Sequence, residues 1–217
     1  MKINHVLFKL VGVAICLMPA ISHAGNFEDP AVYFAVRGGT AKAKVKETNS
    51  FKMDEHPFAI AVGTKFSGSP LRTEIEYSNY SSLKYTNETE IDSGGGVMVP
   101  YTQEAKFGAH TFILNAFLDL PYEECCPPLL RPYIFAGIGI TYMTANVKNY
   151  QSGAYVGSNK DSDWPWVWNV GAGLDVAINQ AVFIEFRGRF LKTFTADELN
   201  AEIESTDLLI GVRFNMY

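Results

Sequence analysis

Carboxylates and arginines alternate along several segments, and this is the first pattern in the sequence that could do chemistry. Glu74 and Glu76 are two positions apart, so in a β-strand both side chains point to the same face. Two carboxylates on one face could serve as a general acid and a general base. Arg72 shares that face, and Arg187 and Arg189 repeat the spacing in a second segment. Because cations accompany the carboxylates, the pattern favours structural ion pairs over acid–base catalysis.

Residues suited to other catalysis or to metal binding are sparse. Beyond residue 24 the histidines are His56 and His110, and neither Gly-x-Ser-x-Gly nor His-Glu-x-x-His occurs. We therefore predict no enzymatic activity, no cofactor and no metal site. Cys125 and Cys126 are adjacent and match no zinc or haem motif. In an exported protein this pair could form a vicinal disulfide, stay free or form an intermolecular bridge.

Residues 1–24 have the pattern of a secretory signal peptide. Lys2 and Lys9 provide positive charge, residues 10–17 form a short apolar core, and the segment ends in Ser22-His23-Ala24. The apolar run is short for the alternative, a transmembrane anchor. We predict export with cleavage after Ala24, which leaves residues 25–217 as one domain.

The composition excludes several classes of protein. The chain has 217 residues, of which 47% are hydrophobic, 13% aromatic and 19% charged, with a formal net charge of −5. Abundant aromatic residues exclude intrinsic disorder, and the excess of acidic residues argues against nucleic-acid binding. No segment after residue 24 has the length and apolarity of a membrane helix. The mean hydropathy of +0.01 fits a soluble protein or a membrane β-barrel, whose strands alternate apolar and polar residues.

A period of two runs through the chain and indicates β-strands. In one segment Ile184 and Phe186 share a face, whereas Glu185 and Arg187 share the opposite face. Eight segments have this pattern: Val32–Val45, Phe58–Phe66, Leu71–Tyr80, Phe107–Leu120, Tyr133–Met143, Trp164–Ile178, Val182–Leu191 and Asp207–Tyr217. Most are near the nine to eleven residues with which a tilted strand crosses a bilayer.

The lengths of the connections alternate as well. Short connections at 67–70, 121–132 and 179–181 separate long polar ones at 46–57, 81–105, 144–163 and 192–206. Short turns at one end and long loops at the other are typical of an outer-membrane barrel. We predict an all-β fold, an eight-stranded antiparallel up-and-down transmembrane β-barrel with short periplasmic turns and long surface loops.

The apolar rows are too long and too aromatic to fill the narrow lumen of eight strands, so we expect them to face lipid. The charged row then faces inward, with five positive and five negative residues that can form an ion-pair network, since unpaired buried charges are costly. The predicted network comprises Arg37, Arg72, Glu74, Glu76, Asp119, Asp175, Glu185, Arg187, Arg189 and Arg213. Gly137, Gly139, Gly171 and Gly173 lie on the inward row and leave space that Arg187 and Arg189 could occupy, as part of a water path or of a packed plug.

Aromatic residues near the strand ends suggest girdles at the two membrane interfaces. They are Tyr33, Phe58, Tyr77, Tyr142, Trp164, Trp166, Trp168 and Tyr217. The last strand, with Gly211, Phe214, Met216 and Tyr217, resembles the C-terminal signal read by the outer-membrane barrel-assembly machinery.

Several strings resemble the surface-antigen and opacity-type outer-membrane proteins, eight-stranded relatives of the OmpA and OmpX barrels. They are SPLRTEIEYSNY from Ser69, FILNAFLDL from Phe112, RPYIFAGIGI from Arg131, WNVGAGLDVAI from Trp168 and LLIGVRFNMY from Leu208. The resemblance implies insertion in the bacterial outer membrane, with both termini in the periplasm and the loops on the cell surface. It also implies an adhesin, an immune-evasion antigen or a weak porin.

We therefore expect a barrel that displays loops for adhesion, host interaction or envelope integrity. Tyrosines lie in or directly beside the long connections, namely Tyr80, Tyr85, Tyr101, Tyr150 and Tyr155, and tyrosine is a common anchor in protein interfaces. The expected partners are outer-membrane lipid, the assembly machinery and host surface proteins, and the acidity of the long connections argues against heparin or nucleic acid. The alternatives are a small porin-like channel and a secreted lipocalin-like carrier.

Overall fold

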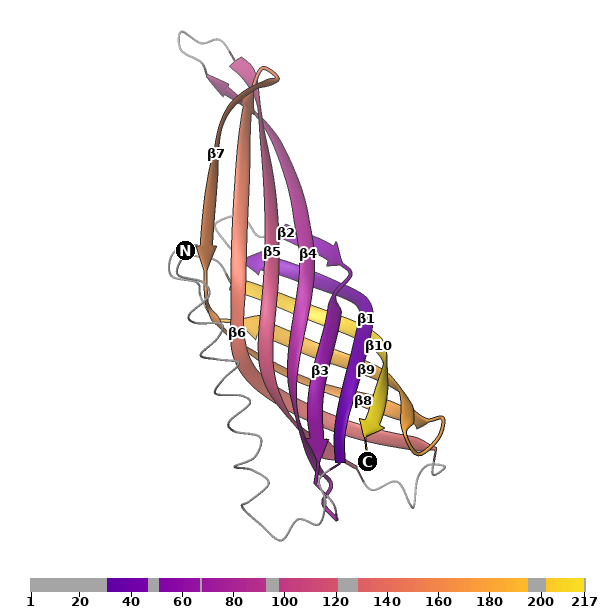
Figure 1. Ribbon diagram of the computed structural model, residues 1–217. Coiled ribbons are helices and arrows are strands. Elements are labelled where there is room, and N and C mark those ends of the chain that lie inside the picture. The colour runs from indigo at the N-terminus through magenta and orange to yellow at the C-terminus, as the bar shows by residue number, and fades with distance from the viewer. Residues whose placement is uncertain are drawn as a thin grey trace.

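The computed structural model describes residues 31–46, 51–66, 68–92, 98–120, 129–194 and 202–216. Within these ranges the chain forms antiparallel β-strands (Figure 1), and no helix there has the length and apolarity to cross a membrane. The predicted signal peptide at 1–24, Cys125, Cys126 and Tyr217 lie outside the described residues. The strands are β1 (Ala31–Lys46), β2 (Phe51–Glu55), β3 (Phe58–Lys65), β4 (Leu71–Asp92), β5 (Met98–Asp119), β6 (Leu130–Gln151), β7 (Ala154–Asp163), β8 (Trp166–Ala177), β9 (Val182–Thr193) and β10 (Glu202–Met216).

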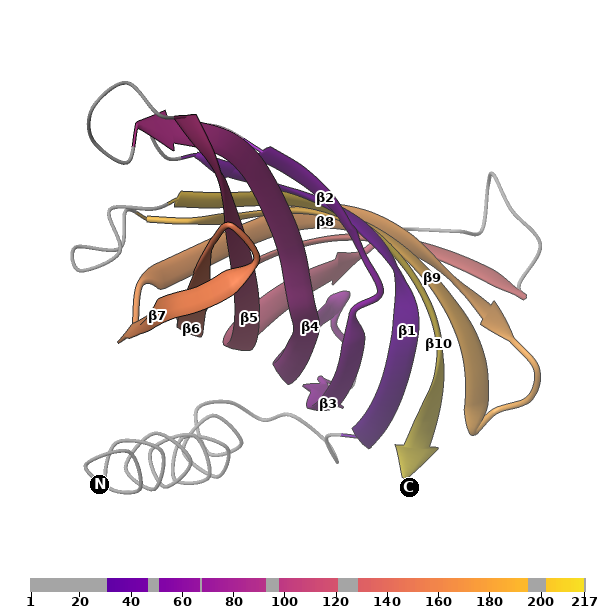
Figure 2. The ribbon, with the colours of Figure 1, turned by 90° about the horizontal axis from the view of Figure 1, so that it is seen from above.

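In the described part of the chain the strands close into a ring with eight positions. Each strand pairs with its neighbour in the order β1, β3, β4, β5, β6, β8, β9 and β10, and β10 pairs with β1 from Val32↔Met216 to Lys46↔Glu202. Seen from above, β1 lies beside β10 and the strands curve around a common axis (Figure 2). Closure leaves no unpaired edge in the ring, which is the condition for a sheet to span lipid.

Two prolines explain why ten strands occupy only eight positions in the ring. Pro57 separates β2 from β3, and both strands pair with β1. Pro165 separates β7 from β8 in the same way, and both pair with β6. Proline has no N–H to donate, but its carbonyl still accepts: Gly39 donates to Pro57 at 3.2 Å and Thr141 to Pro165 at 2.9 Å.

The apolar side chains face outward. On β10 the residues Leu208 and Ile210 are 66% and 54% exposed. Leu209, which lies between them, and Arg213, further along the strand, are buried. Register places Ile60, Val36, Val212, Ile184 and Val176 side by side, an apolar row that crosses five strands. A soluble lipocalin-like carrier would have the opposite orientation, so this alternative is wrong.

The strands on one side of the ring are much longer than expected. The segments 81–105 and 144–163, which we expected to be loops, are mostly strand: β4, β5 and β6 each have 22 residues. About half that length suffices to cross a bilayer. Beyond the ring β4 to β7 form a four-stranded sheet, which rises past the ends of β1 and β10 in Figure 1. We call this part the projecting sheet (residues 83–92, 98–107, 143–151 and 154–163).

Short turns join strands at both ends. Ser152 and Gly153 have φ of 51° and 79°, which gives β6 and β7 a two-residue hairpin turn whose twist suits antiparallel strands. At the opposite end Asn179 closes the β8–β9 turn, because its Oδ1 accepts from the N–H groups of Ala181 and Val182, both at 2.8 Å.

The outward orientation predicts a strong effect of charge on the apolar row. Val212→Arg is expected to lower the free energy of unfolding in lipid vesicles by ~2–4 kcal/mol, since its side chain would enter hydrocarbon. Ala154→Arg, at an exposed position of the projecting sheet, is the control and should change it little. Urea titrations of both refolded variants measure this, and equal stability of the two would contradict the orientation.

Candidate functional site: a charged core beneath a projecting sheet

The ten charged residues expected to face inward form one connected network inside the ring. They come from β1, β4, β5, β8, β9 and β10, and the side chains at its centre are fully buried. Arg37 of β1 is the hub: its Nη2 donates to Glu74 Oε2 at 2.6 Å, its Nε to Glu185 Oε2 at 2.6 Å, and its Nη1 to Glu76 at 3.1 Å. One guanidinium thus joins β1 to β4 and to β9.

All four carboxylate oxygens of Glu74 and Glu76 accept hydrogen bonds. Arg187 Nη1 donates to Glu76 Oε2 at 2.8 Å and to Glu74 Oε1 at 3.2 Å. The remaining oxygen of Glu76 accepts from Arg189 and, at 2.6 Å, from the Ser78 hydroxyl. Because each carboxylate oxygen already binds a donor, the two glutamates stabilise the interior and are not placed for acid–base chemistry.

A layer of the network on the side of the projecting sheet includes residues that the sequence analysis missed. Arg189 Nε donates to Asp207 at 2.5 Å, and Tyr80 donates to the same oxygen at 2.7 Å. Ser205 donates to the other Asp207 oxygen at 2.5 Å. Asp207 is six residues from Arg213 on β10, so both side chains point to the same face of the strand. The alternation of β10 therefore already indicated that Asp207 points inward. Tyr80, expected at the end of a strand beside a surface loop, is instead buried in the ring.

A second layer lies toward the short turns. Arg72 donates to Asp119 at 2.9 Å and lies 3.3 Å from Asp175, which also accepts from Arg213 at 2.7 Å. Lys65 joins this layer by donating to Asp119 at 3.0 Å. With Lys65 and Asp207 included, the network has six positive and six negative residues.

Aromatic rings fill the space beside the arginines. The Arg72 guanidinium lies 4.6 Å from the ring centre of Phe117 and 4.5 Å from that of Tyr133, and Arg187 lies 4.8 Å from that of Phe135. Such stacking favours a cation that is removed from water. The charged core is therefore a packed plug of salt bridges and rings.

The inward glycines make room for rings and an amide rather than for arginines, so that part of our expectation is wrong. A Cβ at Gly173 would collide with the Tyr133 ring and one at Gly171 would lie 2.6 Å from Phe135. At Gly137 it would collide with Asn115, whose Oδ1 accepts from Asn169 at 3.0 Å. The space beside Gly137, Gly171 and Gly173 is thus filled by side chains, as expected for a packed plug.

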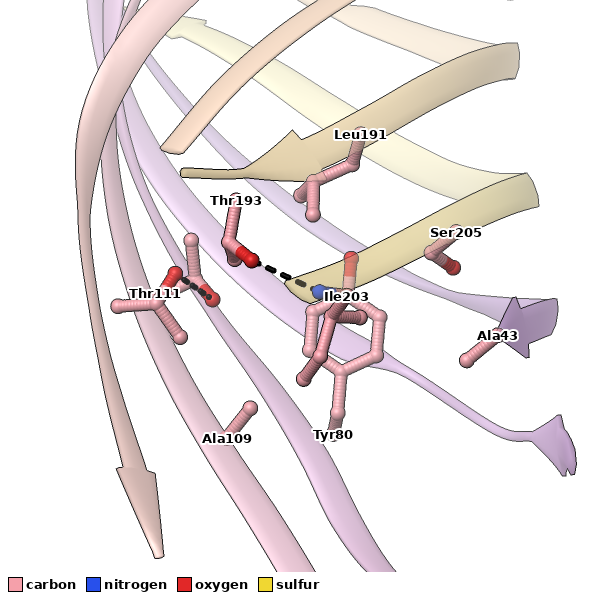
Figure 3. Close-up of a pocket in the computed structure, with 9 residues that line it drawn as sticks. Ala43, Tyr80, Ala109, Thr111, Leu191, Thr193, Ile203 and Ser205 are labelled. Atoms are coloured by element: carbon pink, nitrogen blue, oxygen red, sulfur yellow. Dashed lines mark hydrogen bonds between the residues drawn. The ribbon is translucent and has the colours of Figure 1, made fainter. Parts of the chain in front are cut away.

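A small pocket lies inside the ring beyond Tyr80 (Figure 3). Its volume of about 20 Å³ accommodates roughly one water molecule. Thr111 and Thr141 are hydrogen bonded to each other at 3.1 Å, and Thr193 accepts from the Ile203 N–H at 2.8 Å. With its polar groups satisfied in this way, the pocket has no features of a ligand site. The lining residues are Ala43, Tyr80, Ala109, Thr111, Thr141, Leu191, Thr193, Ile203 and Ser205.

The outward face has an aromatic cluster where the projecting sheet leaves the ring. Tyr77 Oη and His110 Nδ1 are hydrogen bonded at 2.8 Å, and the rings of Tyr142 and Trp164 have centres 4.7 Å apart. The prediction that Tyr33 belongs to a girdle is wrong: this residue is 1% exposed and packs inside the ring against Gly63. Among the described residues no group of three or more His, Cys, Asp or Glu could hold a metal ion.

Solved structures show the same fold. The Neisserial surface protein A has a TM-score of 0.59 and 17% identity, covering 86% of this chain and 99% of that one. The attachment invasion locus protein Ail of Yersinia pestis has a TM-score of 0.52 and 13% identity, covering 86% and 100%. A major outer membrane protein of Thermus thermophilus has a TM-score of 0.53 and 9% identity, covering 87% and 100%.

A search of curated proteins finds no match. The model of the outer membrane protein beta-barrel domain matches residues 11–215, nearly the whole chain. The inward charges, the outward apolar rows and the closure of β10 on β1 are the features of such a barrel. The chain belongs to the outer membrane protein beta-barrel family, whose members lie in the bacterial outer membrane.

Proposed function

We propose that the protein is a non-enzymatic, closed outer-membrane barrel that presents the projecting sheet outside the cell for attachment to host surface proteins. The observation that carries this proposal is the length of β4, β5 and β6, which at roughly 3.3 Å per residue exceeds what the bilayer needs by tens of ångströms. Long connections of such barrels lie on the extracellular side.

The tip of the projecting sheet has the residues of a recognition surface. Met98, Tyr155 and Val156 are each more than half exposed, and Tyr150 packs against Tyr155 with ring centres 5.9 Å apart. Exposed apolar and aromatic side chains on a rigid support are typical of protein-binding sites. The solved structure of Ail, named an attachment invasion locus protein, supports attachment as a role that this fold can have.

The charged core argues against the alternative role of a porin-like channel. The interior side chains of Arg37, Glu74, Glu76, Glu185 and Arg187 have no exposed surface. A solute would have to break several salt bridges at once to pass. We therefore propose that the barrel supports the sheet rather than conducting solutes.

Electrical recording tests the closed interior. In planar bilayers the reconstituted protein is expected to give no discrete current steps, because the plug leaves no continuous aqueous path. The double variant Glu76→Ala, Arg187→Ala, which removes the centre of the plug, is the comparison and should raise the current. Reproducible unit conductance of the unmodified protein would support the channel instead.

The charged core also predicts a stability effect. Glu76→Gln leaves Arg37, Arg187 and Arg189 with less compensating charge and should cost ~3–5 kcal/mol of unfolding free energy. Adding Arg189→Gln should recover part of this loss, since one excess cation disappears. Asp161→Asn, at an exposed position, is the control. Additive losses in a denaturant-based double-mutant cycle would show that the two residues are not coupled.

The attachment role is tested at the tip. The triple variant Met98→Ser, Tyr155→Ser, Val156→Ser is expected to reduce adherence of displaying bacteria to host cells about tenfold or more, because it removes exposed anchors. Ile178→Ser removes an exposed apolar residue at the opposite end and should leave adherence unchanged. Heat-modifiable gel migration checks that both barrels fold. Unchanged adherence of the triple variant would refute this role of the tip.

A further inference from the structure

The aromatic cluster on the outward face gives the level of the membrane interface. Tyr77, His110, Tyr142 and Trp164 are neighbours there, on β4, β5, β6 and the segment before β8. Aromatic side chains with a polar group concentrate at the head-group level of a bilayer. The residues of the projecting sheet just beyond this cluster are therefore next to lipid head groups.

A row of cationic and amide side chains lies beyond the cluster on the same face. Register aligns Lys106 of β5 with Asn146 of β6, and Asn146 with Lys160 of β7. Lys106 is four residues from His110 and Lys160 four from Trp164, so both lie about 13 Å further along their strands. Two strand spacings separate the lysines by roughly 10 Å, with the Asn146 amide between them.

These two lysines have no carboxylate partner among the described residues. Lys65 and Lys192 by contrast pair with Asp119 and with Glu204, at 3.0 Å and 3.1 Å. The acids near Lys160 point away: Asp161 and Asp163 align with Ala145 and Met143, which lie on the inward face.

The nearest charges beyond the row on this face do not neutralise it. Lys148 lies two residues beyond Asn146 and aligns with Glu104 of β5. Lys148 and Glu104 lie opposite each other and carry opposite charges, so together they add no net charge to this face. The positive charge of Lys106 and Lys160 is therefore left for an anion from outside the chain.

We propose that Lys106, Asn146 and Lys160 bind the phosphate group of a phosphorylated glycolipid in the outer leaflet. The two ammonium groups and the amide supply donors on three adjacent strands, and phosphate is the anion that such a set suits. The lysine stems can extend along the strand toward the membrane while the charged ends meet the head groups. The apolar chains of the lipid would then lie against the outward apolar rows.

The position of the row identifies a lipid as the source of the phosphate. It follows an aromatic cluster at the interface, and it faces the same side of the sheet as the lipid-facing residues His110 and Phe112. A site for free phosphate would not need to lie on the lipid-facing side of the sheet. This inference depends on the orientation of the barrel and not on the proposed attachment role.

Lipid titration with the full chain, refolded and held in detergent micelles, tests the site. The probe is phosphorylated lipid A, and bound lipid is counted by native mass spectrometry. The double variant Lys106→Gln, Lys160→Gln should bind it roughly 10- to 30-fold more weakly, because each lysine near a membrane surface contributes to anion binding. Dephosphorylated lipid A should bind both proteins equally.

A matched control separates this site from a general loss of charge. Lys42→Gln, Lys192→Gln removes two lysines from β1 and β9 and should leave the affinity unchanged. Equal affinity of the Lys106, Lys160 variant for the phosphorylated lipid would overturn the proposal, as would an equal loss in the control. Displacement of the lipid by millimolar inorganic phosphate would overturn the assignment to lipid.

Discussion

An arginine inside an eight-stranded ring has little access to bulk water, so its charge must be matched by carboxylates within reach of its guanidinium. Arg37 meets this condition with three glutamates from β4 and β9. Its own strand, β1, closes the ring against β10. The salt bridges therefore connect strands that are not neighbours in the ring, and the same contacts that neutralise the charges fill the space between them.

The balance of charge determines what else can occupy the interior. Rings of Phe117, Tyr133 and Phe135 pack against the arginines, and glycines on β8 leave room for two of them. A larger residue at Gly173 would displace the Tyr133 ring, which lies against Arg72. Salt bridges, rings and glycines therefore depend on one another, and together they fill this part of the interior.

The alternation of residues was sufficient to predict the strands in the membrane, because lipid outside and charge inside impose opposite demands on successive positions. It failed for the projecting sheet, because toward the tip the residues on both faces of β4 to β7 are exposed or partly exposed and the polar contrast is lost. The Ser152-Gly153 pair is a turn signal that could have indicated the β6–β7 hairpin. Burial of Tyr33 depends on Gly63 of the next strand, which the sequence of β1 alone does not reveal.

The projecting sheet has two strand edges, along β4 and β7, that no strand in the described residues covers. Exposed edges invite pairing with other chains, and proteins resist this with charge and irregularity. On β7 the edge has Lys160 and Asp161 in succession, and the pairing of β6 with β7 shifts register at Asn149/Tyr150. Because these features disfavour the addition of a strand, contacts of the sheet with partners should depend on side chains at its tip and on its faces. The proposed attachment then involves the tip and the proposed lipid contact involves the part near the membrane, so that the two roles use different residues of one sheet.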